Sequence, residues 1–296
     1  MRLNHVLCLL LLSAAGCTSV PYRAGKDSGR IHGYRLPAGE PQLVVGRPNR
    51  FLDASDWMWP GSLLGKLMLW NVNVDSHQVS PETIDAIRRY LVDNELRDVK
   101  VRINGYSVGD ELRRTIRNKA VGAGWRFTFG MMAWLQYTIL PGRFFGGDHY
   151  NPYANSINIY SDLVPVALHE SGHAKDFAGR TFKGTYAFLY AAVPFFNLYP
   201  EAKASSDVLS YLQDLDDRAG KKSAYHLLYP AYGTYLGGDI ASWVNHPWNF
   251  TVQAGAIVAG HVVGRTKAAF MPRPSSPPPA PRPAQGIARF QIRGRR

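Results

Sequence analysis

Residues 161–180 read SDLVPVALHESGHAKDFAGR. Ser161 is a good N-cap residue and Gly179 suits the C-terminal stop, so we predict an α-helix here that ends at Gly179. The helix contains the pattern His-Glu-x-x-His, made by His169, Glu170 and His173. Histidines four residues apart leave one face of a helix a turn apart. Both imidazoles can therefore bind one metal ion.

The residue types in this pattern favour zinc and hydrolysis. Glu170 follows His169 and is offset from it by about 100° around the helix, so it can reach a water molecule without binding the metal itself. A bound Zn²⁺ ion lowers the pKa of water to about 7 and polarises a carbonyl group. Glu170 can then act as the general base that takes the proton. We therefore predict zinc-assisted hydrolysis at this helix.

The surrounding sequence predicts a buried helix preceded by a strand. Residues 164–168 are mainly apolar and would seat the helix in a core, and Gly172 leaves room for close backbone approach. Residues 155–160, NSINIY, alternate between polar and apolar side chains, which predicts an exposed edge strand. Such a strand can pair with an extended peptide through backbone hydrogen bonds. We therefore expect a peptide or protein substrate.

With these features the chain resembles the zincin metallopeptidases, and among them the Glu-zincins. The resemblance covers about residues 148–215 and is specific only at the five-residue motif. It implies an α+β zincin-like domain with an upstream edge strand, the HExxH active-site helix and a second helix that donates a glutamate. Residues 200–207, which read PEAKASSD, resemble that second helix. The resemblance thus implies Zn²⁺ held by His169, His173 and Glu201, with Glu170 as catalytic base.

The sequence departs from related patterns at two places. The metzincin extension is absent, because Asp176 and Gly179 occupy the positions of its glycine and its third histidine. Ser205 stands four residues after Glu201, where Glu-zincins often hold an acid that orients a ligand histidine. Two rivals for the third ligand remain open from the sequence: Asp207 on the predicted second helix, and Asp176.

An aromatic turn at residues 229–235 follows the motif in the sequence. A tyrosine hydroxyl can stabilise the oxyanion of a tetrahedral intermediate. Tyr232 is the candidate for this role, and the alternative is that it is a structural aromatic residue.

The N-terminus has the features of an export signal over residues 1–16. Arg2 supplies the positive charge, residues 6–12 are apolar, and small residues precede Cys17. This arrangement resembles the lipobox of bacterial lipoproteins, which implies cleavage before Cys17 and its acylation. The chain would then be anchored in the bacterial cell envelope, with the outer membrane favoured if the cell has one, because Thr18 and not an aspartate follows. The alternative is an ordinary secretory signal.

Cysteine usage limits the ligands that a metal could have. The two cysteines are Cys8, inside the predicted signal, and Cys17. The mature chain would therefore have no thiol for a disulfide or for a thiolate metal site. We expect His, Asp and Glu to hold any metal ion.

The length and the composition predict one folded domain with appendages. With 296 residues, 46% of them hydrophobic, the chain can bury a large core. We assign that core to a zincin-like domain at 76–270. Residues 17–75 are a tether and N-terminal extension with a short strand near 42–45, and residues 271–296 are a disordered Pro/Arg-rich tail. One further helix is predicted to start at Ser80-Pro81, and a second is predicted to span residues 111–120. A strand is predicted at residues 99–103.

Three apolar stretches leave two interpretations open. They cover residues 127–140, 186–199 and 250–264, and each is shorter than the roughly 20 residues of a spanning helix. They are predicted to be either core helices or segments inserted in the membrane interface.

The positive charge is concentrated at one end of the chain. The formal net charge is +12, but the tail carries six arginines and no acid, so without the signal and the tail the body carries +5. An exported protein rarely meets nucleic acid, and we expect no nucleic-acid partner. Anionic lipid or cell-wall polymer is the expected partner of the basic tail.

These observations together predict a zinc-dependent peptidase anchored in the bacterial envelope. The alternative is a structural or membrane-associated lipoprotein whose zinc site is degenerate or serves only to stabilise the fold.

Overall fold

The computed structural model describes residues 36–47, 60–140, 147–244 and 248–272, with isolated positions at 22, 49, 51, 53 and 142. Its contacts divide the chain into two compact units, one centred on residues 23–192 and the other on residues 193–281. We call them the sheet unit and the helical unit. The chain is of mixed α+β class, as predicted, with one small sheet among the described residues. The predicted signal, Cys17 and the tail beyond residue 272 lie outside the described residues.

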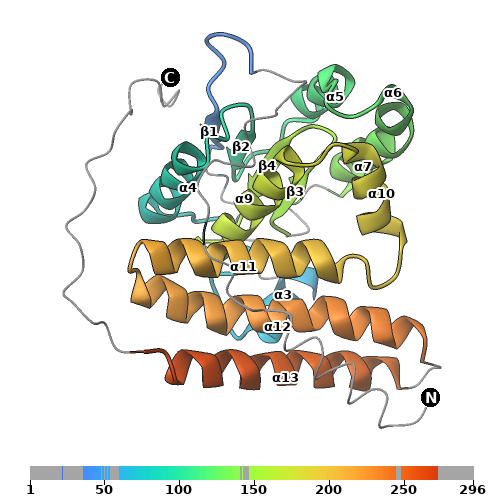
Figure 1. The fold of residues 1–296 in the computed structure, drawn as a ribbon. Helices are drawn as coiled ribbons and strands as arrows, with labels where there is room; N and C mark the ends of the chain where they lie inside the picture. Colours follow the sequence, from blue (N-terminus) through green and yellow to red (C-terminus); the bar gives the residue numbers. More distant parts are fainter. Residues whose placement is uncertain are drawn as a thin grey trace. The chain divides into compact units, whose positions relative to one another are not determined.

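The sheet unit holds the four strands and the helices from α3 to α10 (Figure 1). Its strands are β1 (Leu43–Val45), β2 (Lys100–Ile103), β3 (His149–Asn151) and β4 (Ser156–Ile159). Its helices are α3 (Pro60–Leu69), α4 (Pro81–Asp93), α5 (Val108–Arg117), α6 (Ala123–Trp125), the π-helical turn η2 (Arg126–Gly130), α7 (Met131–Ile139), α9 (Val164–Ala178) and α10 (Lys183–Ala192).

Local sequence signals account for several of these elements. Ser80 is the N-cap of α4 and its hydroxyl accepts the Thr83 N–H, with proline in the first turn, as predicted. The strand predicted at 99–103 is β2, and the helix predicted at 111–120 is α5, which begins and ends three residues earlier. The strand predicted near 42–45 is β1. Because β1 pairs with β2, the folded part of the chain extends upstream of residue 76.

The sheet has the strand order β1-β2-β4-β3. β1, β2 and β4 are parallel, and β3 pairs antiparallel with β4. The predicted edge strand at 155–160 is therefore wrong in its position: β4 is an inner strand, and β3 is the edge strand on that side. The three-residue β3 and the short turn after it carry little strand pattern, and they cover the edge that β4 would otherwise expose.

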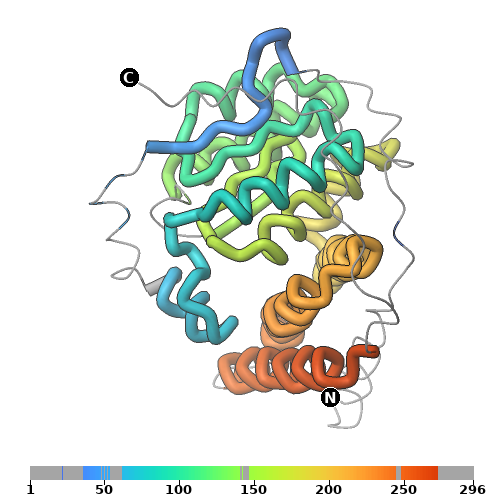
Figure 2. The backbone as a smooth tube through the Cα atoms, turned by 90° about the vertical axis from the view of Figure 1, so that its left-hand side faces the viewer, coloured from blue at the N-terminus to red at the C-terminus, as the bar shows by residue number. Residues whose placement is uncertain are grey.

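One face of the sheet is apolar and packs against α9. Val101, Ile103, Ile157 and Ile159 alternate onto this face and are fully buried. Tyr150 of β3 lies on it too, and its ring is 5.5 Å from that of Phe177 in α9. α4 packs against α9, and the two helices run side by side in the tube view (Figure 2).

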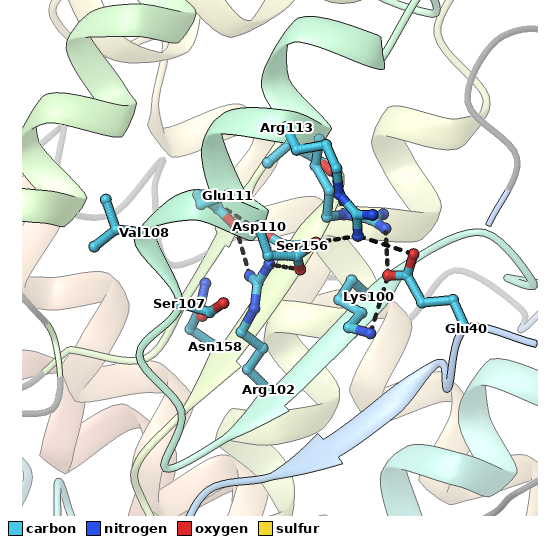
Figure 3. Close-up of polar contacts among 12 residues, drawn as sticks. Glu40, Lys100, Arg102, Ser107, Val108, Asp110, Glu111, Arg113, Ser156 and Asn158 are labelled. Carbon is cyan, nitrogen blue, oxygen red and sulfur yellow. Dashed lines mark hydrogen bonds and ion pairs between the residues drawn. The ribbon is translucent and has the colours of Figure 1, made fainter. Parts of the chain in front are cut away.

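The other face of the sheet is polar and is covered by α5 (Figure 3). Arg102 of β2 donates to Asp110 at 2.6 Å and to Glu111 at 2.5 Å, and both acids stand on α5. Glu111 also accepts hydrogen bonds from Ser156 of β4 and Asn151 of β3. The buried charges are therefore paired and hydrogen-bonded, as burial requires. The neighbouring carboxylates raise the pKa of Arg102 against the opposing effect of burial.

Hydrogen bonds from distant segments hold the junction between β4 and α9. The Asp162 carboxylate accepts from the Ser80 N–H and hydroxyl and from the Thr83 hydroxyl, at 2.7–2.9 Å. The Ser161 hydroxyl accepts the Asp75 N–H at 2.8 Å. The prediction that Ser161 is the N-cap of the motif helix is therefore wrong. Its hydroxyl oxygen accepts a hydrogen bond from the loop at Asp75, and α9 begins only at Val164. The predicted stop at Gly179 is confirmed.

The helical unit consists of α11 (Leu198–Asp214), α12 (Arg218–Ser242) and α13 (Asn249–Ala269). α12 and α13 pack closely along their lengths through small residues. A Cβ added at Gly260 of α13 would lie 2.5 Å from the Tyr229 carbonyl oxygen, and one at Gly233 of α12 would lie 2.6 Å from that of Ala256. The glycines therefore set the distance between the two helices.

The three apolar stretches lie in helices and the turns between them. Residues 127–140 form most of η2 and α7, residues 186–199 run from α10 into the start of α11, and residues 250–264 lie in α13. Among the described residues, no helix is both long and apolar enough to cross a membrane.

Replacing Asp162 by Ala should destabilise the sheet unit by about 1–3 kcal/mol at neutral pH, because three hydrogen bonds to a carboxylate are lost. Burial alone would raise the pKa of Asp162, but the bonds from Ser80 and Thr83 outweigh it and hold this pKa below its usual value. The stabilisation is therefore present above the pKa of an unfolded aspartate, about 3.9, and is lost as pH falls through the lower pKa of the folded state.

Urea unfolding of both proteins across this pH range measures the effect. The control is Asp85→Ala, which removes an exposed ion pair with Arg88 on α4 and should cost little. Equal stabilities of Asp162→Ala and the unaltered protein at neutral pH would contradict the role given to the carboxylate.

Gly260→Ala should destabilise the helical unit by about 1–3 kcal/mol, because the new methyl group collides with the backbone of α12. Gly255 lies on the same helix with nothing within 4 Å of an added Cβ. Gly255→Ala should be neutral, or should stabilise by up to about 1 kcal/mol through helix propensity. Chemical unfolding followed by circular dichroism compares the two variants. The packing account fails if both alanines have the same effect.

Candidate metal centre

The motif residues lie on a helix that is buried along nearly its whole length. His169 and Glu170 are each 8% exposed, and His173 is 4% exposed. The apolar residues of α9 explain this position, since Leu168 and Phe177 are buried against the sheet unit's core. The sequence thus places three ionisable groups where water has little access.

The two histidines present their ring nitrogens to each other. The Nε2 atoms of His169 and His173 are 3.1 Å apart, and the rings are nearly perpendicular, at 86°. Two imidazole nitrogens bound to a tetrahedral zinc ion at 2.0–2.1 Å would be about 3.3 Å apart. The observed separation therefore fits a shared metal ion.

A third potential ligand completes the group. Glu201 stands near the start of α11 and is 1% exposed. One ligand atom from each of His169, His173 and Glu201 lies within 4.8 Å of the other two, so this buried group can hold a metal ion. Among the described residues, the group does not include the rivals Asp207 and Asp176.

Asp176 has a different role, as a link between α9 and α10. Its carboxylate accepts from Arg180 at 2.7 Å and from the Tyr186 hydroxyl at 2.7 Å. The Arg180 guanidinium also lies over the Tyr186 ring, 4.1 Å from its centroid. These contacts fix the start of α10 against the end of the motif helix.

Lys183 closes the C-terminal end of α9. Its ammonium group donates to the carbonyl oxygens of Ala178 and Arg180 at 2.9 and 2.6 Å. A cation at this position complements the partial negative charge of the helix end. Burial lowers the pKa of Lys183 to about 8, against the opposing effect of Asp176.

One residue near the site was missed in the sequence analysis. Tyr190 of α10 is half-buried, and its ring centroid is 5.9 Å from that of His173, with the planes 30° apart. It lies in the apolar stretch at 186–199, where nothing in the pattern separates it from core aromatic residues. The link through Asp176 is what brings α10, and with it Tyr190, beside the motif.

Two predicted site residues stay predictions. The turn predicted at 229–235 is wrong, because these residues lie inside α12; Tyr232 is half-buried there, and its role as a stabiliser of an oxyanion is untested. Cys17 lies outside the described residues, so acylation there is also untested.

Comparisons with known proteins found no match, whether with protein-family models, with curated proteins or with solved structures. The function must therefore be argued from the site itself.

Proposed function

We propose that this chain is a zinc-dependent peptidase of the bacterial cell envelope. The observation that carries the proposal is the buried donor set of two imidazoles and one carboxylate, with Glu170 next to His169 in the chain. Structural zinc sites are usually closed by four protein ligands, whereas catalytic sites have three and an open position. Three such groups gather among the described residues, which favours the catalytic type.

The donor types fit zinc. Imidazole and carboxylate are ordinary zinc ligands, and the sequence offers no thiolate outside the predicted signal and Cys17. In the proposal His169, His173 and Glu201 hold the ion. When bound, the ion polarises the substrate carbonyl group and lowers the pKa of water.

Glu170 has the proton-transfer role in this proposal. Its carboxylate takes a proton from the attacking water as the new carbon–oxygen bond forms, and later gives it to the leaving nitrogen. The carbon–nitrogen bond then breaks, leaving one product with a carboxylate and the other with an amine. The low exposure of Glu170 strengthens its electrostatic interactions with the reacting groups.

A peptide substrate is supported by the edge strand. β3 is an outer strand of the sheet, and α9 packs against both β3 and β4. An extended peptide can add to such an edge by backbone hydrogen bonds. The sequence predicted that β4 would pair with the peptide, but β4 is an inner strand. In the proposal the peptide therefore pairs with β3.

The location belongs to the same proposal. The lipobox-like sequence at Cys17 supports anchoring by acyl chains, and the Pro/Arg-rich tail supports contact with anionic lipid or cell-wall polymer. A substrate protein or peptide would then be met in the envelope.

Glu170→Gln should retain zinc and the fold but lose hydrolysis by about 10²–10⁴-fold, because the amide keeps the shape and cannot take the proton. The measurement is turnover of envelope proteins and of a peptide library by the purified protein. His169→Ala should lose both zinc and turnover. If the site were purely structural, His169→Ala would unfold the protein, while Glu170→Gln would leave every measured property unchanged.

Glu201→Gln should weaken zinc binding by about tenfold or more, because a charged ligand becomes a neutral and poorer one. Asp207→Asn, on the same helix, is the matched control and should bind zinc as the unaltered protein does. Competition with a fluorescent chelator measures both affinities. Full zinc affinity in Glu201→Gln would show that Glu201 is not the third ligand.

A further inference from the structure

Five exposed apolar side chains form a face on α7 and its flanks. Between Phe127 and Gly142 the sequence has no charged residue. We call the side chains concerned the α7 face: Phe127, Met132, Leu135, Ile139 and Leu140, which are 56, 64, 49, 61 and 49% exposed. Positions 132, 135 and 139 have helical spacing and form one stripe. Exposed apolar side chains grouped on one short segment in this way often mark an interaction site.

The opposite side of α7 is the one that packs against the protein. Tyr137 is buried, and its hydroxyl accepts the Ser107 N–H at 2.9 Å. The Trp134 indole donates to the Val108 carbonyl oxygen at 3.1 Å. α7 is therefore fixed to the start of α5 through one side, and the α7 face is directed away from that contact.

Basic side chains stand on the neighbouring α5 segment. From Leu112 to Gly147 the sequence contains six basic residues and no acid. Of these, Arg113, Arg117 and Lys119 are exposed, and we call them the basic rim. Arg113 and Arg117 line an open hollow on α5 together with Leu112 and Ile116. α5 packs against η2 and α7, so the helix that carries most of the rim and the helix that carries the α7 face are neighbours in the sheet unit (Figure 1).

The polar side of the sheet explains why the rim is basic. The acids of α5, Asp110 and Glu111, pair with Arg102 on the sheet (Figure 3). Arg113 of the rim pairs with Asp110 at 2.6 Å and with Glu40 at 3.1 Å, which compensates much of its positive charge. The carboxylates of α5 are thus used inside the protein, and its outer side presents cations.

We propose that the α7 face and the basic rim dock the sheet unit on an anionic phospholipid bilayer. α7 is about 14 Å long, less than half of the roughly 30 Å hydrocarbon thickness, so it would lie in the interface and not cross it. Interfacial helices bind by burying an apolar face while basic groups contact anionic headgroups, which is the combination present here. A nucleic acid would offer no surface to the apolar residues. The inference does not rest on the proposed peptidase activity.

The test is co-sedimentation with vesicles of phosphatidylcholine and phosphatidylglycerol. The full chain carrying Cys17→Ser is used, because this removes the expected acylation site. Leu135→Gln with Ile139→Gln should lower vesicle binding by about tenfold or more. The matched control is Leu64→Gln with Leu67→Gln on α3, where the side chains are 49 and 62% exposed. This pair should bind as the parent protein does.

The charge contribution has its own pair of variants. Arg117→Gln with Lys119→Gln should lower binding by roughly fivefold per charge, and should reduce its dependence on salt. Arg89→Gln with Arg97→Gln removes two exposed charges elsewhere on the sheet unit and should have a smaller effect. Melting temperatures of all variants check that the fold is retained.

Several outcomes would overturn the proposal. Binding of Leu135→Gln with Ile139→Gln at the parent level would do so, as would an equal loss in the α3 pair. A parent protein that ignores the vesicles but forms dimers, which the α7 substitutions dissociate, would assign the α7 face to a second copy of the chain.

Discussion

Burial of polar side chains is the constraint on which the rest of this structure depends. α9 is covered along almost its whole length, yet it carries two histidines, a glutamate, a lysine and an aspartate. Each buried polar group must be hydrogen-bonded or ion-paired, because an unpaired one destabilises the folded state. The Asp176 carboxylate accepts hydrogen bonds from Arg180 and Tyr186. The Nε2 atoms of His169 and His173 are 3.1 Å apart. A metal ion would satisfy the two imidazoles and Glu201 together, which is why the group is informative about function.

The two faces of the sheet differ in how their side chains are buried. The apolar face packs against α9, so it gives the motif helix a rigid support. The polar face is closed by α5 through Arg102 and its two carboxylates (Figure 3). Because these acids are used internally, the outer side of α5 is left basic beside an apolar α7. One internal ion-pair network thus shapes both the support of the site and the character of an outer surface.

The sequence predicted the features that depend on neighbouring residues. Ser80-Pro81 marks the start of α4, and the five-residue motif places both histidines on one helical face. It failed where the answer depended on a distant partner. The polar positions of β4, Ser156 and Asn158, are predicted to face solvent by the pattern, but both are buried: Ser156 donates to Glu111 of α5, and Asn158 is hydrogen-bonded to His149 of β3. An alternating pattern does not show whether a polar side chain faces solvent or a buried polar partner, so the sequence predicts β4 as an edge strand. Tyr190 was missed for a similar reason, since only the Asp176 link brings α10 to the motif.

Anomalous diffraction at the zinc edge from crystals of the protein tests the central claim most directly. The account predicts one strong peak at about 2.0–2.1 Å from the Nε2 atoms of both His169 and His173 and from a carboxylate oxygen of Glu201. It also predicts that soaking with a chelator removes the peak. A hydrolytically active crystal form with no zinc at these two histidines, or with zinc bound elsewhere, would contradict the account.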